Sequence, residues 1–251
     1  MTNHFKLHHL LLAGLATLGA CSSVVQVKDV TADQDGYLRQ KFATSEVSPA
    51  VVAKLPKTGG GSFSHIVLTR QVNTESSDGK KETGTAVTTY TDGGNGIVYY
   101  RIEHAMNGIP YGQTYASAYK GVLVLRSQLV PLRQQSTTAL YEIKEIVAIT
   151  PFPTDIGKTF SVKYKTGSTM QIANYSDAER ACTTVRRFPA AELHAKLGGT
   201  ATELDCEERT NNSVRSRGKW AMLEQYGFAV QVESTSATSK ATYRITDVSG
   251  A

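Results

Sequence analysis

Short runs of β-branched and aromatic residues, each followed by a turn signal, fill the chain after Gly61 and constrain the fold more than any other feature. The turn signals lie at 76–79, 92–95, 107–110 and 166–168, and their residues tolerate positive φ or form local hydrogen bonds. This pattern is typical of successive antiparallel hairpins. The expected strands are 62–72, 83–91, 96–106, 111–119, 121–130, 139–150, 158–165, 169–175, 201–207, 219–226, 228–234 and 240–247.

The pattern predicts a mostly β fold, a single antiparallel sheet, a sandwich or an open barrel of about 10–12 short strands, with one short helix. Charged and apolar residues alternate in segments such as 141–146, so each sheet is expected to have one wet and one buried face. Because the hairpins follow one another, a meander order is favoured over a Greek key.

The one predicted helix lies between Cys182 and Cys206. Pro189 suits its first turn, Leu193 and Leu197 would share one face, and the glycines at 198–199 would end it.

The N-terminal segment has the layout of a secretory signal, in which Lys6 precedes an apolar run that is too short to span a bilayer. The run ends in Leu18-Gly19-Ala20-Cys21, which resembles the lipobox of bacterial lipoproteins. The resemblance implies cleavage before Cys21, diacylglycerol on its sulfur and acyl chains such as palmitate. Because Ser22 follows rather than aspartate, the resemblance favours the outer membrane, with the protein facing the periplasm.

Three parts are therefore expected in the chain. Residues 1–20 form the signal peptide, and residues 21–58 form a lipidated N-terminus and flexible tether, since this segment is polar, weakly periodic and broken by prolines. Residues 59–251 form the antiparallel β domain.

Two cysteines remain once Cys21 is assigned to lipid. Cys182 and Cys206 form an even set, which in an oxidising periplasm favours a disulfide. The alternatives are two free buried thiols or a metal site. No histidine stands at zinc-ligand spacing from either cysteine, so no metal is predicted.

The charge balance argues against nucleic acid as a partner. The chain has 27 Lys+Arg and 22 Asp+Glu, and this modest excess forms no dense basic stripe. A local basic patch would result if the disulfide joined Arg186 and Arg187 to Arg215, Arg217 and Lys219; the alternative is a solvated loop face.

Fragments that imitate catalytic motifs have the wrong context. The serine and lysine of 77–80 stand at the spacing of penicillin-binding enzymes, but a hairpin tip is predicted there. The glycines at 59–61 lack the lysine of a phosphate loop. His65 and His104 have no matched nucleophile, so neither catalytic nor cofactor-binding residues are predicted.

A row of tyrosines is the best candidate for a binding face. Tyr111, Tyr115 and Tyr119 share one side if their segment is a strand, and their flat rings suit sugars or an extended peptide. The alternative is core packing, and the same spacing also fits a helical stripe.

We therefore expect a non-enzymatic envelope lipoprotein, attached to the membrane through its lipid, that binds an envelope protein or surface polymer. The alternative is a carrier that holds a small apolar ligand or lipid inside a curled sheet.

Overall fold

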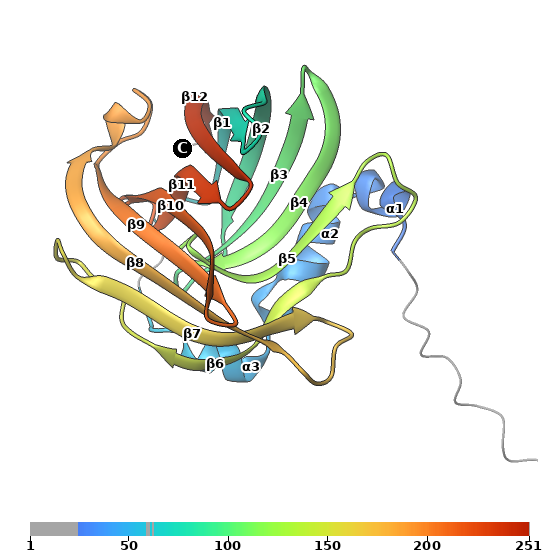
Figure 1. Cartoon of the computed structure of the whole chain (residues 1–251), viewed down its shortest axis with the longest axis horizontal. Helices are drawn as coiled ribbons and strands as arrows, with labels where there is room; N and C mark the ends of the chain where they lie inside the picture. The colour runs from blue at the N-terminus through green and yellow to red at the C-terminus, as the bar shows by residue number, and fades with distance from the viewer. Residues whose placement is uncertain (1–24, 59–60, 62, 251) are drawn as a thin grey trace, which may run out of the picture.

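The structure, a computed structural model, describes residues 25–58, 61 and 63–250, so the predicted signal peptide and Cys21 lie outside it. The described residues form a closed antiparallel barrel in which every strand pairs with its neighbour in sequence and β1 pairs with β12 (Figure 1). The predicted meander order and the mostly β class are confirmed, and the sheet closes into a barrel. The strands are β1 (His65–Ser76), β2 (Lys81–Asp92), β3 (Ile97–Met106), β4 (Ile109–Tyr119), β5 (Leu123–Pro131), β6 (Tyr141–Ile149), β7 (Thr159–Ser168), β8 (Ser176–Pro189), β9 (Thr200–Thr210), β10 (Ser213–Leu223), β11 (Phe228–Ser236) and β12 (Ser239–Ser249).

The barrel consists of two six-stranded halves, β12 with β1–β5 and β6–β11, which curve over opposite sides of the molecule (Figure 1). The halves are joined by short pairings, since β5 and β6 share only the pairs at Arg126 and Ser127, and β11 and β12 only those from Glu233 to Thr235. The strand connections alternate between two ends. We call the end with the connections 77–80, 107–108, 132–140, 169–175, 211–212 and 237–238 the open end, and the other the closed end.

Two hairpin ends meet inside the closed end. Lys120 and Gly121 lie in the β4–β5 turn with φ values of 52° and 70°, which suit a tight hairpin. The Ala229 amide donates to the Lys120 carbonyl at 2.9 Å, and a Cβ on Gly121 would lie 2.3 Å from the Ala229 oxygen. Glycine is therefore required where β4–β5 touches β11. Buried residues pack on both sides of this contact in two separate clusters.

The segment predicted to be a tether is folded against the barrel. It forms α1 (Val27–Ala32), α2 (Gln34–Phe42), the 3-10 turn η1 (Thr44–Glu46) and α3 (Pro49–Lys54), beside β3–β6 (Figure 1). Val30, Phe42 and Val51 are almost completely buried. The prediction of a flexible tether over residues 21–58 is thus wrong for residues 25–58, because apolar side chains spaced along three short helices find partners on the barrel.

Two local predictions are also wrong. The predicted strand 169–175 is the connection between β7 and β8, and Gly167 lies within β7, where its missing side chain makes room for that of Gln171. The predicted helix after Pro189 is a single 3-10 turn, η2 (Ala190–Glu192). Leu193 and Leu197 nevertheless both pack against the core.

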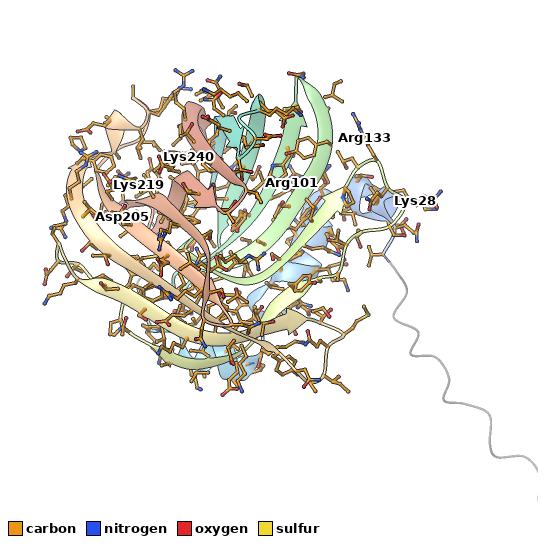
Figure 2. All side chains as sticks on the ribbon, in the orientation of Figure 1. Lys28, Arg101, Arg133, Asp205, Lys219 and Lys240 are labelled. Carbon is orange, nitrogen blue, oxygen red and sulfur yellow. A yellow bond between two sulfur atoms is a disulfide. The ribbon has the colours of Figure 1, made fainter. Side chains whose placement is uncertain are left out.

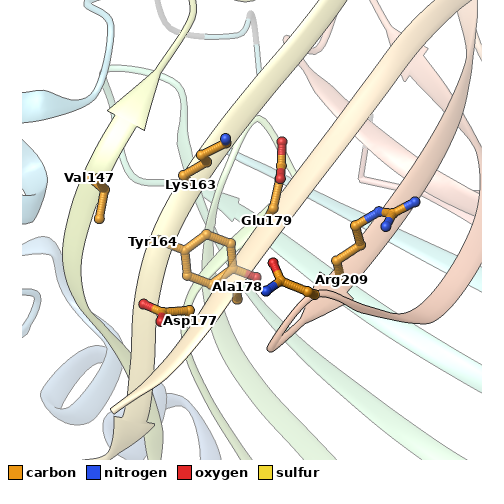
Figure 3. Close-up of a pocket in the computed structure, with 8 residues that line it drawn as sticks. Val147, Lys163, Tyr164, Asp177, Ala178, Glu179 and Arg209 are labelled. Carbon is orange, nitrogen blue, oxygen red and sulfur yellow. The ribbon is translucent and has the colours of Figure 1, made fainter. Parts of the chain in front are cut away.

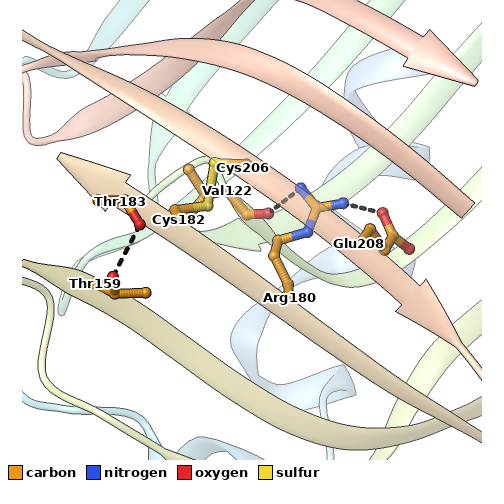
Figure 4. Close-up of a disulfide and its surroundings, with 7 residues drawn as sticks. All are labelled: Val122, Thr159, Arg180, Cys182, Thr183, Cys206 and Glu208. Atoms are coloured by element: carbon orange, nitrogen blue, oxygen red, sulfur yellow. Dashed lines mark hydrogen bonds and ion pairs between the residues drawn. A yellow bond between two sulfur atoms is a disulfide. The ribbon is translucent and has the colours of Figure 1, made fainter. Parts of the chain in front are cut away.

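The predicted disulfide is confirmed, since Cys182 on β8 and Cys206 on β9 lie directly opposite each other and are bonded (Figure 4). Both sulfur-bearing side chains are buried in the cluster that Phe160 and Leu204 also join. The bond closes a loop with a sequence separation of 24 residues that includes η2.

Replacing both Cys182 and Cys206 by serine should lower the free energy of unfolding by about 3 kcal/mol, because the open chain regains loop entropy. Urea unfolding of the two proteins measures the difference. Addition of reductant should destabilise the parent protein and leave the double variant unchanged; equal stability of the two proteins would contradict the expectation.

Candidate ligand-binding cavity

A cavity of about 700 Å³ lies inside the barrel, toward its open end. Its wall combines apolar surface from Val124, Leu125 and Ala178 with the rings of Tyr141 and Tyr164. A cavity of this size falls in the range that holds small ligands. Its polar lining consists of Ser127, Glu142, Thr166, Gln171, Ser176, Arg180, Glu208, Thr210 and Arg215.

Arg180 is the most firmly held charged group of the cavity. Its guanidinium donates to the Val122 carbonyl at 2.8 Å and pairs with Glu208 on the neighbouring strand (Figure 4). It also lies 5.7 Å from the centre of the Trp220 ring. Glu208 on β9, the Val122 carbonyl beside the β4–β5 turn and the Trp220 ring together hold this arginine in place. It can therefore contact a ligand without changing its conformation.

Both carboxylates of the cavity are engaged by cations. Glu208 is held by Arg180, while Glu142 lies 2.8 Å from the Lys144 ammonium and 3.7 Å from Arg126. Arg215 differs, because it is exposed and no carboxylate of the described residues lies within ion-pair distance of it. It occupies an irregularity in the β9–β10 register, between Val214 and Ser216, at the cavity mouth.

Tyr164 forms part of the wall between this cavity and a smaller hollow of about 240 Å³, since it lines both. Figure 3 shows Lys163 and Glu179 on one side of its ring and Asp177 on the other. Burial, and then the charge of Glu208, raises the pKa of Tyr164 to about 12. The phenol therefore stays neutral and can donate or accept a hydrogen bond.

A second buried arginine leaves the barrel interior with uncompensated positive charge. Arg70, on β1, is 4% exposed and donates to the Thr88 hydroxyl at 2.8 Å, and its guanidinium lies 5.4 Å from the Tyr243 ring centre. Its Nε has no hydrogen-bond partner, and no carboxylate of the described part of the chain pairs with it. A buried cation without a counter-ion favours anions nearby.

His104 also lies in this interior, on β3, with its Nε2 3.0 Å from the Thr114 hydroxyl and its ring stacked on that of Tyr111. Burial, and then the charge of Arg70, lowers the pKa of His104. The histidine is therefore held in its neutral form by the folded protein.

Stability should consequently fall as the pH decreases from 7 to 5. The unfolded chain takes up a proton on His104 near pH 6.5, whereas the folded protein takes it up only at lower pH because its His104 pKa is lowered, so acid favours unfolding by at most about 1.4 kcal/mol per pH unit. Urea titrations across this range measure the slope. The slope should become shallower in His104→Gln; a slope identical to that of the parent protein would refute the assignment.

The tyrosine row does not form an exposed face. Tyr115 and Tyr119 are fully buried on β4, since Tyr115 packs against Phe42 of α2 and Tyr119 donates to the Pro56 carbonyl. Tyr111 is exposed, but it lies beyond an irregularity in the strand and stacks on His104. The helices of residues 25–58 thus cover the row, which corrects the predicted binding face.

The predicted basic patch is neutralised by carboxylates. Lys219 and Arg186 both pair with Glu203, and Arg217 pairs with Glu207, on the outer face of β8–β10. Lys219 also stands opposite Asp205 in the register of β9 and β10, and both residues are labelled in Figure 2. Of the five predicted residues, only Arg215 lacks an ion-pair partner within the described residues; Arg187 pairs with Glu224.

The comparisons give no relative from which a site could be transferred, since no protein-family model, curated protein or solved structure matches this chain. Within residues 25–58, 61 and 63–250, no group of three metal-ligating side chains converges. No helix in the described part of the chain is long and apolar enough to cross a membrane. The cavity therefore has to be interpreted from its own chemistry.

Apart from Arg215, which belongs to the predicted basic patch, the cavity residues are not among those singled out from the sequence. A signal for them existed, however, because Arg180 and Glu208 stand two residues from the two cysteines, on opposite sides. In antiparallel strands whose cysteines face each other, these positions also face each other, on the same side of the sheet. The observed register pairs Arg180 with Glu208.

Proposed function

We propose that this chain is an acylated lipoprotein of the bacterial outer membrane that binds a small amphipathic anion in the barrel cavity, without catalysing a reaction. The cavity of about 700 Å³ carries this proposal. It offers apolar wall for a hydrocarbon portion and the cation Arg215 at its mouth for a polar group. The unpaired charge of Arg70 adds to the preference for an anion.

Binding is favoured over catalysis by the state of the polar groups. Glu142 and Glu208 each have oxygens engaged by a cation, and Arg180 is tied to a backbone carbonyl as well. A general base needs a free lone pair within reach of its substrate. Fixed, mutually paired charges instead suit recognition of a ligand that keeps its covalent structure.

Trp220 provides the test. It is the single tryptophan of the chain and lies beside Arg180, so a ligand entering the cavity should change its fluorescence. Titration with dodecanoate should give a saturable change, and organic extracts of protein purified from its own membranes should contain lipid in stoichiometric amount. The proposal would be refuted by the lack of a fluorescence change together with an empty extract.

Arg215→Ala should bind dodecanoate about tenfold more weakly, because a charge-assisted contact contributes on the order of 1.5 kcal/mol or more. Arg217→Ala is the matched control, since this arginine lies two residues away on the outer face, paired with Glu207. Trp220 fluorescence measures both affinities. Equal affinities of the two variants would show that Arg215 does not hold the ligand.

A module that binds an envelope protein or surface polymer is the second candidate. It is favoured by the apolar side chains at the open end, such as Ile172 and Met170, which are exposed by 91% and 69%. Crosslinking in intact envelopes should then capture one stable protein partner, and a titration with dodecanoate should leave Trp220 unaffected.

A further inference from the structure

The open end of the barrel carries most of the exposed apolar surface. Ten large apolar side chains of the described residues are exposed, and seven of them lie in or beside the connections of the open end. We call these seven the apolar rim: Ile109, Tyr111, Leu129, Tyr141, Met170, Ile172 and Val214. Exposed apolar groups scattered singly need no explanation, whereas their concentration around the mouth of a cavity indicates an interaction surface.

The described chain begins at this same end. Residues 25–27 lie against the β5–β6 connection, where the Val27 amide donates to the Gln135 carbonyl and the Thr137 amide donates to that of Val25. Cys21 precedes Val25 by four residues, a length of chain that reaches at most about 14 Å. An acyl chain on Cys21 would therefore hold the membrane surface close to the open end.

The charges near this point suit an anionic surface. Lys28 and Arg133 are exposed at the same edge of the molecule (Figure 2). Like Arg215 at the cavity mouth, neither has a carboxylate of the described residues within ion-pair distance. Each cation close to an anionic leaflet contributes about 1 kcal/mol of attraction.

We infer that the apolar rim docks on the anionic lipid bilayer to which the chain is anchored, with the cavity mouth facing the membrane. This inference rests on the proposed lipidation of Cys21. Docking would place Ile172 and Met170 among the lipids and Lys28 and Arg133 at their phosphates. A lipid or fatty acid could then pass between bilayer and cavity without crossing water.

Two isoleucines at opposite ends of the barrel allow a matched test. Ile172 lies in the β7–β8 connection of the open end, and Ile156 lies in the β6–β7 connection of the closed end, where it is 48% exposed. Ile172→Cys and Ile156→Cys each add a single free thiol, since the other cysteines are lipidated or disulfide-bonded, and take an environment-sensitive fluorophore. The lipidated full-length proteins are reconstituted in phosphatidylethanolamine–phosphatidylglycerol vesicles with brominated acyl chains.

The label at position 172 should shift to shorter wavelength and be quenched at least twofold more by brominated lipid than the label at position 156. Lys28→Glu with Arg133→Glu, or vesicles of phosphatidylcholine alone, should weaken that quenching. Equal quenching at both positions, or none at position 172, would overturn the docking. Failure of the anchor is distinguishable, because the protein would then not float with the vesicles at all, and failure of ligand binding appears only in the Trp220 titration.

Discussion

Replacing Phe42 by alanine should lower the free energy of unfolding by about 3–5 kcal/mol, as expected when a fully buried aromatic ring is removed from a core. Phe42 is 0% exposed at the end of α2, stacked on Tyr115 with ring centres 6.1 Å apart. Its cluster includes Val30, Leu38 and Val130, so residues of α1, α2 and β5 lose contact together. Urea unfolding followed by circular dichroism measures the change.

The matched control is Ile172→Ala, at a side chain that is 91% exposed and should change stability by less than about 0.5 kcal/mol. If Phe42→Ala were as mild as this control, the helices of residues 25–58 would not be part of the cooperative unit, and a tether would be the better description. A change in the slope of the transition rather than its midpoint would indicate that the helices unfold separately.

Replacing Cys21 by serine should move the protein from the membrane fraction to the soluble fraction of the cell envelope. Two or three acyl chains, at about 0.8 kcal/mol for each buried methylene, make attachment stable, whereas one chain is marginal. Fractionation of cells and mass spectrometry of the N-terminal peptide measure attachment and acylation. Normal processing and membrane fractionation of Cys21→Ser would refute the lipid anchor.

A salt wash separates the anchor from the proposed docking. Any Cys21→Ser protein that stays on membranes through the apolar rim and its cations should be released at high ionic strength, because salt screens the attraction of Lys28 and Arg133 to lipid phosphates. The parent protein should resist the same wash. Release of both proteins would show that acylation does not hold the chain.

The sequence contained enough information for the class of fold, because strand formation and turn formation are local. Turn residues such as Asn107 and Gly108 have positive φ at a hairpin, as their identity predicts. The predicted disulfide needed only the count of cysteines. Because the two cysteines lie opposite each other in β8 and β9, Arg180 lies opposite Glu208 in the same register.

Features that depend on tertiary contacts could not be predicted in the same way. β8 is charged along its outer face, with Asp177, Glu179 and Arg186, and only its place between β7 and β9 makes it a strand. Residues 25–58 have weak helical periodicity because each short helix has few inward positions. Closure of the sheet and the shape of the cavity depend on the short pairing between β5 and β6, which involves only two residue pairs. No local sequence pattern predicts that pairing.

The contact between Gly121 and Ala229 has a consequence for exchange of a bound molecule. This contact joins the β4–β5 turn to β11 by a backbone hydrogen bond, so the two hairpins cannot move apart without breaking it. A molecule that enters the cavity through the open end, as proposed, leaves by the same route. The occupant then has to depart before the next molecule enters, so the rate of departure sets the rate of exchange, whatever the concentration of free ligand.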